Sequence, residues 1–464
     1  MTDAKAEYEQ WRHRVEQAPR DPLAQFNFAW WASRLGQFSR AIQAYEQAIA
    51  LGISQPEEAM TNIAAIYSER LARSTDAQAW LLQALQCNGD YFPAVFNRAH
   101  LAEQLGDREG AEAGFTRACQ LQPNNPLPLT RLVEAARVVR SSDSSVIQLR
   151  QLAETSDDPD VFYALAKVEE RLGNTDAAWL ALETANRYDG KRAPAWPHEL
   201  IKKSYDTLKQ HQIERPSGSK GPVFIVGMFR TGSTLLEQIL AAHTAFTPLG
   251  ESEFWPRTIA ASGGAMVVPG QVPVAEQLEV SRSQFREHLI ERGVDLSRRV
   301  TDKRPDNLYH LPLIAKAIPD ARFIITERDW RDTLISVYGT RLHPQHGYAT
   351  SPLSIKTQLE QCSSLATHWQ AMAPDRVRRF AYEDLVAKPE STMRALFEWL
   401  GESWEPECLE FHRLTNPVLT ASVWQVREPL STTRQGRWRQ YDAPLQSIFG
   451  DELYLSSDAL AGTQ

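Results

Sequence analysis

Residues 222–240 read Pro-Val-Phe-Ile-Val-Gly-Met-Phe-Arg-Thr-Gly-Ser-Thr-Leu-Leu-Glu-Gln-Ile-Leu, and this stretch decides the fold of the C-terminal half. Its first five residues are a short apolar, β-branched run of the kind that is buried in a parallel sheet. After Thr234 the apolar residues have helical spacing, so the pattern predicts a strand, a glycine-bracketed loop and a helix. In this arrangement the loop amides and the positive end of the helix point at one anion. The stretch therefore predicts an α/β domain that binds a phosphate group.

The loop has the spacing of the nucleotide-binding sequence Gly-x4-Gly-Lys-Ser/Thr except at one position. Ser233 stands where that sequence has lysine, whose ammonium neutralises the β- and γ-phosphates in enzymes that use ATP or GTP. Its absence argues against triphosphate chemistry and leaves the loop for a smaller anion. The anion-binding residues that we expect in this loop are Arg230, Thr231, Gly232, Ser233 and Thr234.

The N-terminal part of the chain contains a pattern of small and bulky residues that recurs at about 34 residues, the length of a tetratricopeptide helix pair. The clearest copies contain Ala29, Ala99 and Ala166, each followed seven residues later by a glycine. Two weaker copies, one through Ala65 and one around residues 127–155, suggest five repeats. The alanines allow paired helices to approach, and the glycines allow tight turns. A groove that binds a partner and a purely structural arm both fit this pattern.

A change of composition marks a domain boundary. Residues 206–221 are polar and rich in Pro, Gly and Ser, and the chain after them is strand-like rather than helical. We therefore expect a multidomain protein with an all-α tetratricopeptide-like solenoid over residues 1–205 and a linker over 206–221. An α/β domain of the P-loop-like type, with a central parallel sheet, is expected over residues 222–464.

Charge and composition argue against several classes of protein. The 50 basic and 58 acidic side chains give a net charge of −8, so nucleic acid and anionic membrane are not expected as partners. The N-terminus is charged from its third residue, and no apolar run approaches the roughly 20 residues that span a bilayer. A cytoplasmic protein is expected. Four cysteines without paired spacing argue against a disulfide framework and against a zinc site.

A second buried strand is predicted at residues 322–326, and ligands in open parallel sheets gather at the carboxyl ends of such strands. Arg328 follows this strand and is well placed to bind an anion, although a surface ion pair is the commoner use of such an arginine. Ser336 lies eight residues later in a helical stretch, so it returns to the same side of the helix after about two turns.

The segments Phe224–Leu235 and Glu327–Ser336 together resemble the two donor-binding segments of the sulfotransferase superfamily. The resemblance is stronger to bacterial tetratricopeptide-repeat sulfotransferases and to the related protein-tyrosine sulfotransferases. Those enzymes use 3′-phosphoadenosine 5′-phosphosulfate (PAPS) and release 3′-phosphoadenosine 5′-phosphate (PAP). The resemblance implies that the loop holds the 5′-phosphosulfate and that Arg328 and Ser336 hold the 3′-phosphate. It covers nearly all of residues 222–441.

The same resemblance implies further donor-binding residues. Tyr382 follows a third strand, residues 377–381, at the position that approaches the nucleotide in the family. Residues 420–441 resemble the late cofactor loop of the family. The matching positions in that loop are Ser422, Gln425 and Arg437. Two departures are Phe229, where many members have proline, and Arg341, which lies one position from a phosphate-binding arginine of the family.

Sulfuryl transfer requires a base for the acceptor hydroxyl and positive charge beside the leaving group. By the resemblance, Glu251 is the base, with Glu253 as the alternative because the register there is blurred by one residue. Lys303 matches the catalytic lysine of the family, and Ser422 donates a further hydrogen bond to the sulfuryl oxygens. No metal is expected, because the donor lacks the β/γ bridge that magnesium clamps.

These patterns favour a PAPS-dependent sulfotransferase with an acceptor hydroxyl, for example a tyrosine on a peptide or protein held by the repeats. A glycan or a small-molecule acceptor stays open, and the sequence does not determine the oligomeric state. One alternative is a P-loop kinase or NTPase, which Ser233 disfavours. The other is a repeat scaffold with an inactive nucleotide-binding domain, which would not need all of Arg230, Glu251, Lys303, Arg328, Ser336 and Ser422.

Overall fold

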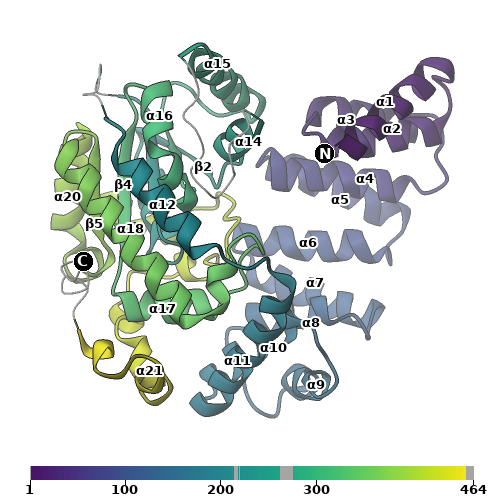
Figure 1. Cartoon of the computed structure of the whole chain (residues 1–464). Helices are drawn as coiled ribbons and strands as arrows, with labels where there is room; N and C mark the ends of the chain where they lie inside the picture. The colour runs from purple at the N-terminus through teal and green to yellow at the C-terminus, as the bar shows by residue number, and fades with distance from the viewer. Residues whose placement is uncertain (1, 214–217, 219, 262–274, 456–464) are drawn as a thin grey trace. The chain divides into compact units, whose positions relative to one another are not determined.

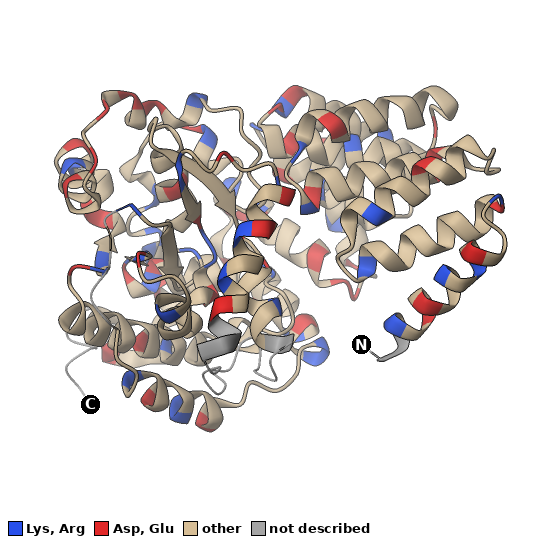
Figure 2. Ribbon diagram, turned by 90° about the horizontal axis from the view of Figure 1, so that it is seen from above, with Lys and Arg blue, Asp and Glu red and all other residues tan. Residues whose placement is uncertain are grey.

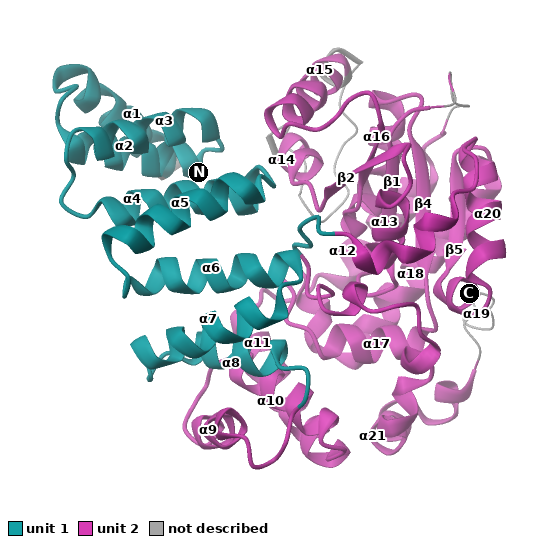
Figure 3. Ribbon diagram, turned by 180° about the vertical axis from the view of Figure 1, so that it is seen from behind, with its two compact units in different colours: residues 1–138, 415–419 teal, residues 139–414, 420–464 magenta. Residues whose placement is uncertain are grey.

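The computed structural model describes residues 2–213, 218, 220–261 and 275–455 (Figure 1). Contacts within the chain divide it into two compact units (Figure 3). Unit 1 contains residues 1–138 and 415–419, and unit 2 contains residues 139–414 and 420–464. The last helical repeats thus belong to the same compact unit as the sheet, while a boundary at residues 206–221 stays a prediction.

Unit 1 is built from antiparallel helix pairs. Its helices are α1 (Thr2–Gln17), α2 (Pro22–Arg34), α3 (Phe38–Ala50), α4 (Pro56–Ala65), α5 (Ser74–Cys87), α6 (Phe92–Leu105), α7 (Arg108–Leu121) and α8 (Pro126–Ala135). Asp21 caps α2 by accepting hydrogen bonds from the amides of Leu23 and Ala24. Gly106 ends α6 in the left-handed region, at φ 81°. These local signals confirm the predicted repeats.

The second repeat differs from the first and third by one residue. Ala29 and Ala99 are buried between paired helices, and the residue that is buried in the same way on α4 is Ala64 rather than the expected Ala65. A π-helical turn, Ile66–Arg70, follows α4 and inserts one residue before α5. The insertion explains why this copy of the repeat is weak in the sequence.

Unit 2 begins with the remaining repeat helices, α9 (Ser144–Ala153), α10 (Pro159–Arg171) and α11 (Thr175–Arg192), followed by α12 (His198–Lys209). The side chain of Asn186 on α11 joins them to the α/β part. Its Oδ1 accepts a hydrogen bond from Tyr163 OH at 2.9 Å, and its Nδ2 donates to the carbonyl oxygen of Tyr338 at 2.9 Å. Because these groups are buried, the satisfied amide fixes the contact between repeat and α/β helices.

A five-stranded, entirely parallel sheet forms the centre of unit 2. The strands are β1 (Val223–Gly227), β2 (Phe246–Gly250), β3 (Arg299–Asp302), β4 (Arg322–Glu327) and β5 (Val377–Ala381), in the order β2-β3-β1-β4-β5. All five residues of β1 are buried, as its apolar sequence predicts. Gly227 pairs with Thr326, and Glu327 pairs with Ala381. This register brings the carboxyl ends of β1, β4 and β5 to one edge of the sheet.

Helices cover both faces of the sheet (Figure 1). They are α13 (Ser233–Ala241), α14 (Phe254–Ala261), α15 (Ala275–Glu291), α16 (Leu311–Ala317), α17 (Trp330–Tyr338), α18 (Pro352–Met372), α19 (Tyr382–Ala387), α20 (Pro389–Leu400) and α21 (Asp442–Phe449). Val223 and Ile225 of β1 pack against Leu236 and Ile239 of α13 in one buried apolar cluster. Each such buried side chain contributes roughly 1.5–3 kcal/mol, so the cluster holds the loop between β1 and α13 in place. The predicted fold class is confirmed.

Charged residues of both signs are interspersed along the helices (Figure 2). Within the part of the chain that the structure describes, no helix combines the length and the apolar character needed to cross a bilayer.

Candidate active site

The loop between β1 and α13 follows a tightly constrained path. A Cβ atom on Gly227 would lie 2.7 Å from the carbonyl oxygen of Thr326, and one on Gly232 would lie 2.9 Å from Cδ2 of Tyr382. The hydroxyl of Thr231 donates to the carbonyl of Met228 at 2.7 Å and lies 2.7 Å from Oγ1 of Thr326. The loop therefore has little freedom to move away from the edge of the sheet.

Arg230 has a positive φ of 71°, which is rare for residues other than glycine and costs of order 1–3 kcal/mol. Its guanidinium contacts three residues from distant parts of the chain. Nε donates to Ser336 Oγ at 3.0 Å, Nη1 to Ser422 Oγ at 2.5 Å and Nη2 to Gln425 Oε1 at 3.3 Å. The structure thus brings four of the expected donor-binding residues together around one guanidinium.

Other arginines surround Arg230. Burial, together with repulsion from Arg434, Arg437 and Arg328, lowers the pKa of Arg230 to about 10, and attraction by the carboxylate of Glu251 opposes this fall. A cluster in which like charges dominate is unfavourable unless an anion joins it. Two of these arginines also have acidic partners, Arg437 in Glu170 and Arg328 in Asp332.

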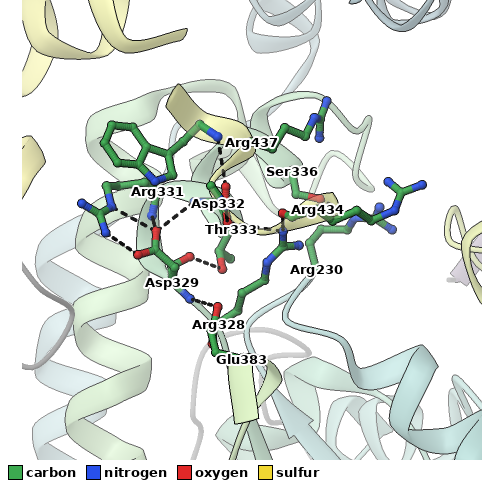
Figure 4. Close-up of polar contacts among 12 residues, drawn as sticks. Arg230, Arg328, Asp329, Arg331, Asp332, Thr333, Ser336, Glu383, Arg434 and Arg437 are labelled. Carbon is green, nitrogen blue, oxygen red and sulfur yellow. Dashed lines mark hydrogen bonds and ion pairs between the residues drawn. The ribbon is translucent and has the colours of Figure 1, made fainter. Parts of the chain in front are cut away.

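Arg328 extends from the end of β4 across the ring of Tyr382, with Cζ 4.7 Å from the ring centre. Its Nη2 donates to the carbonyl oxygen of Arg434 at 2.5 Å and lies 3.6 Å from Oδ2 of Asp332 (Figure 4). Burial raises the pKa of Tyr382, while Arg328 and Arg434 oppose that rise. The stacked tyrosine holds the planar guanidinium at the carboxyl edge of the sheet.

Asp332 attaches the late loop to the first turn of α17. Its Oδ2 accepts from the amide of Gly436 at 2.7 Å, and its Oδ1 accepts from the amide of Trp438 at 3.0 Å. Two hydrogen bonds from backbone amides to one buried carboxylate are strong and directional. This anchor brings Arg434 and Arg437 close to Arg328 (Figure 4).

The side chain of Arg437 forms a two-pronged ion pair with Glu170 of α10. The same carboxylate accepts hydrogen bonds from Gln440 Nε2 at 2.9 Å and from Tyr441 OH at 3.1 Å. Burial would raise the pKa of Glu170, but Arg437 prevails and lowers it. The late loop is therefore fastened to the last repeat as well as to α17.

The remaining loop residues and Arg341 lie as follows. Ser233 and Thr234 start α13 and are buried, and Thr234 Oγ1 lies 3.3 Å from Oγ1 of Thr420. Arg341 points to the repeats instead, where it pairs with Asp160 at 2.6 Å and with Asp189 at 3.1 Å. Arg341 thus has two carboxylate partners outside the arginine cluster.

A second charged group lies at the ends of β2 and β3. Lys303 Nζ is 2.6 Å from Glu251 Oε1, and the lysine side chain is 1% exposed while that of the glutamate is 34% exposed. The amide of Lys303 also donates to the carbonyl of Gly250 at 2.9 Å. Glu253 instead pairs with Arg257 of α14 at 3.0 Å and is 44% exposed. Of the two candidate bases, Glu251 is the one in contact with the lysine.

A cavity of about 380 Å³ opens between α18 and the carboxyl ends of β1, β4 and β5; Thr231 and Arg328 line it, whereas Arg230, Glu251 and Lys303 do not. Ligands of parallel sheets bind at this edge. Among the described residues, no group of three or more His, Cys, Asp or Glu side chains is arranged to hold a metal ion.

Comparison with known families agrees with this geometry. Residues 222–406 match the model of the sulfotransferase family, and residues 92–125 match the model of a tetratricopeptide repeat. Residues 222–406 are thus similar to sulfotransferases, and residues 92–125 are similar to a tetratricopeptide repeat. The resemblance to sulfotransferases and to tetratricopeptide-repeat proteins that the sequence indicated is confirmed.

Relatives of this chain include an uncharacterised protein of Aquifex aeolicus, 28% identical over 310 residues. That alignment covers 62% of this chain and 40% of the Aquifex protein, so the chain spans well under half the length of that relative. Protein-tyrosine sulfotransferase 2 of Gallus gallus is 23% identical over 267 residues, which cover 52% of this chain and 70% of that enzyme.

Solved structures similar to this chain include the sulfotransferase domain of the Synechococcus PCC 7002 olefin synthase and the tetratricopeptide protein YrrB. The first is 17% identical with a TM-score of 0.37, covering 49% of this chain and 91% of that domain. The second is 18% identical with a TM-score of 0.32, covering 39% of this chain and 93% of that protein. Both scores are too low to carry a conclusion about function.

Four residues of this candidate site were not expected from the sequence: Glu170, Glu237, Asp332 and Arg434. Asp332 carried a signal, since it is an acid in the first turn of the helix within the second donor-binding segment. Glu170 carried none, because its arginine partner is 267 residues away.

Proposed function

We propose that the protein transfers the sulfuryl group of PAPS to an acceptor hydroxyl. The observation that carries the proposal is the set of three hydrogen bonds from Arg230 to Ser336, Ser422 and Gln425. One guanidinium in contact with both the helix after β4 and the late loop is suited to a donor with anionic groups at two ends. The family match over residues 222–406 supports the same reaction.

The residues present fit the two anionic groups of PAPS. The strained loop directs Arg230 and the start of α13, with Ser233 and Thr234, toward a 5′-phosphosulfate. Arg328 and Arg434 lie side by side at the carboxyl edge of β4, where repulsion among the arginines would be relieved by a phosphomonoester. Ser233 in place of a lysine leaves no ammonium in the loop for a third phosphate.

Arg437 and Tyr382 complete the proposed donor site in supporting roles. Arg437 reaches the arginine cluster, and Glu170 fixes its guanidinium in one orientation. Tyr382 packs against Gly232 and under Arg328, so it sets the distance between the two anion sites. We propose that both residues shape the donor pocket mainly by position.

When bound, PAPS supplies a sulfuryl group whose S–O bond to the 5′-phosphate breaks as a bond to the acceptor oxygen forms. We propose that Glu251, half-exposed beside the buried Lys303, takes the proton of the acceptor hydroxyl. Lys303 would then neutralise charge on the leaving phosphate, and Arg230 and Ser422 would donate to the sulfuryl oxygens.

For the acceptor we propose a peptide or protein that presents a tyrosine hydroxyl. Tetratricopeptide repeats commonly bind extended segments, and relatives named as protein-tyrosine sulfotransferases support the same class. Transfer to a glycan or to a small-molecule hydroxyl instead would replace the peptide as the proposed acceptor.

The proposed function is tested by incubating the purified chain with PAPS and a library of tyrosine-containing peptides, and measuring PAP release and peptide mass. An increase of one sulfuryl group on a tyrosine, with one equivalent of PAP, is the expected result. Release of PAP only with glycans or small phenols would keep the reaction and change the acceptor. Binding of ATP with magnesium and no binding of PAP would overturn the proposal.

A further inference from the structure

Glu237 is a buried carboxylate directly behind the proposed catalytic pair. It lies on α13, one turn after Ser233, and is 3% exposed. Its Oε1 accepts from the amide of Gly250 at 3.1 Å and from Thr301 Oγ1 at 3.4 Å. The amide that it binds is the one immediately before Glu251, so Glu237 determines where that turn lies.

The charged groups that face Glu237 come from three segments. Lys303 follows β3 and attracts its charge, Glu251 follows β2 and repels it, and Arg292 follows α15 and also faces Asp302. Burial raises the pKa of Asp302 well above its ordinary value. Glu251 is the carboxylate that pairs with Lys303, and Glu237 is the further carboxylate whose charge Lys303 stabilises.

Building on the proposed function, we propose that Glu237 is a positioning residue for sulfuryl transfer. It holds the Gly250–Glu251 turn and provides the second carboxylate for the buried ammonium of Lys303. This second carboxylate is needed only while Glu251 carries a proton.

The need follows from the proton balance of the reaction. When Glu251 accepts the acceptor proton, the 2.6 Å ion pair with Lys303 loses its negative partner. An ammonium that is 1% exposed cannot regain that stabilisation from water. An ionised Glu237 keeps Lys303 charged until the leaving phosphate has received its electron pair and Glu251 has released its proton to solvent. Ionised Glu237 also repels the charge of Glu251 and makes it a stronger base.

Protonation of Glu237 in the neutral pH range makes this role measurable. Burial raises its pKa to about 7, with Lys303 and the Gly250 amide opposing the rise. The carboxylate is therefore ionised above about pH 7 and neutral below it. We expect kcat of the wild-type protein to fall as the pH drops through 7.

The test compares Glu237→Gln with the wild type under saturating PAPS and a working acceptor. Glutamine keeps an oxygen for the Gly250 amide but removes the charge. We expect kcat to fall at least 10-fold at pH 8, KM for PAPS to stay within two-fold, and the change in rate near pH 7 to disappear. Glu169→Gln is the matched control, because Glu169 is a buried carboxylate paired with Arg150 in the repeats. Its pH profile should be that of the wild type.

A second readout needs neither donor nor acceptor. The free energy of unfolding of the free protein, measured by denaturant from pH 5 to pH 8, should rise in Glu237→Gln relative to the wild type as the pH increases. The sign follows because the folded wild type binds more protons than the unfolded chain in this range. Glu237→Asp keeps the charge, so it should lower kcat but retain the change in rate near pH 7.

Unchanged kcat in Glu237→Gln, or a change in rate near pH 7 that survives in that variant, would overturn the role of Glu237. Loss of that change in Glu237→Asp would also overturn it. Failure of the proposed function has a different signature, because the wild type itself would then neither bind PAP nor release it from PAPS.

Discussion

The two charged groups at the edge of the sheet are built in opposite ways. Around Arg230, four arginines, counting Arg230 itself, face three carboxylates, so positive charge is in slight excess. The carboxylates are those of Glu251, Glu170 and Asp332. Around Glu237, Lys303 attracts its charge, Glu251, which pairs with Lys303, repels it, and Asp302 adds a third acid. Excess charge of one sign prepares a site to bind an ion of the other sign. Where buried positive and negative charges nearly balance, the protonation state of one group strongly affects the charge state of its neighbours.

The largest effect is expected when the charged group around Lys303 loses its proposed base, Glu251. Glu251→Gln should lower kcat by about 100- to 10,000-fold, the range usual for a general base, because the amide cannot take the acceptor proton. Affinity for PAP, measured by calorimetry, should stay within two-fold. Glu253→Gln is the control, since Glu253 pairs with Arg257 away from Lys303. Equal losses in both variants would contradict the assignment.

The balance of charge in the second group also predicts a cost in stability. The rise of the Glu237 pKa from 4.5 to about 7 corresponds to about 3 kcal/mol of folding free energy lost as the pH rises through that window. At pH 8, Glu237→Gln should recover up to this amount in denaturant unfolding, and at pH 4 it should recover none. If Glu237→Gln changed the free energy of unfolding equally at both pH values, burial would not raise the pKa of Glu237 in the folded protein.

In the arginine cluster the effects fall on binding instead of turnover. Arg328→Ala should weaken PAP binding by about 10- to 100-fold, because hydrogen bonds to a charged group are worth roughly 1.5–3 kcal/mol. Arg341→Ala is the matched control, since its guanidinium is occupied by Asp160 and Asp189. Similar losses of affinity in the two variants would place the phosphate site elsewhere.

The smallest effect is expected for Arg434, whose side chain is more exposed than that of Arg328. Arg434→Ala should weaken PAP binding about two- to five-fold at low salt, and the difference should shrink in 0.5 M NaCl because salt screens exposed charges. Arg413→Ala, an exposed arginine paired with Glu410, should change nothing. A loss that does not depend on salt would show that Arg434 acts by holding the loop rather than by its charge.

The comparison also shows what the sequence could predict. The strand, loop and helix of residues 222–240 form as expected because apolar periodicity and glycines act locally. The contacts of Arg230 with Ser422 and Gln425 join residues 192 and 195 positions apart, and only the family resemblance pointed to them.

Other features could not be predicted from local pattern at all. The left-handed backbone of Arg230 is maintained by its surroundings, since arginine has no preference for that region. The shift from Ala65 to Ala64 depends on a π-helical turn that has no sequence signature. Glu237 reads as one polar residue in an apolar helix, and its role depends on β2 and β3 meeting above it.

The central claim is that the arginine cluster binds a terminal phosphate at the 3′ position of an adenosine donor. Calorimetric titration of the wild-type protein with PAP and with adenosine 5′-monophosphate tests it most directly, because the two ligands differ only in the 3′-phosphate. The account predicts binding of PAP at least 100-fold tighter, with the difference reduced in Arg328→Ala. Equal affinity for the two ligands would contradict it.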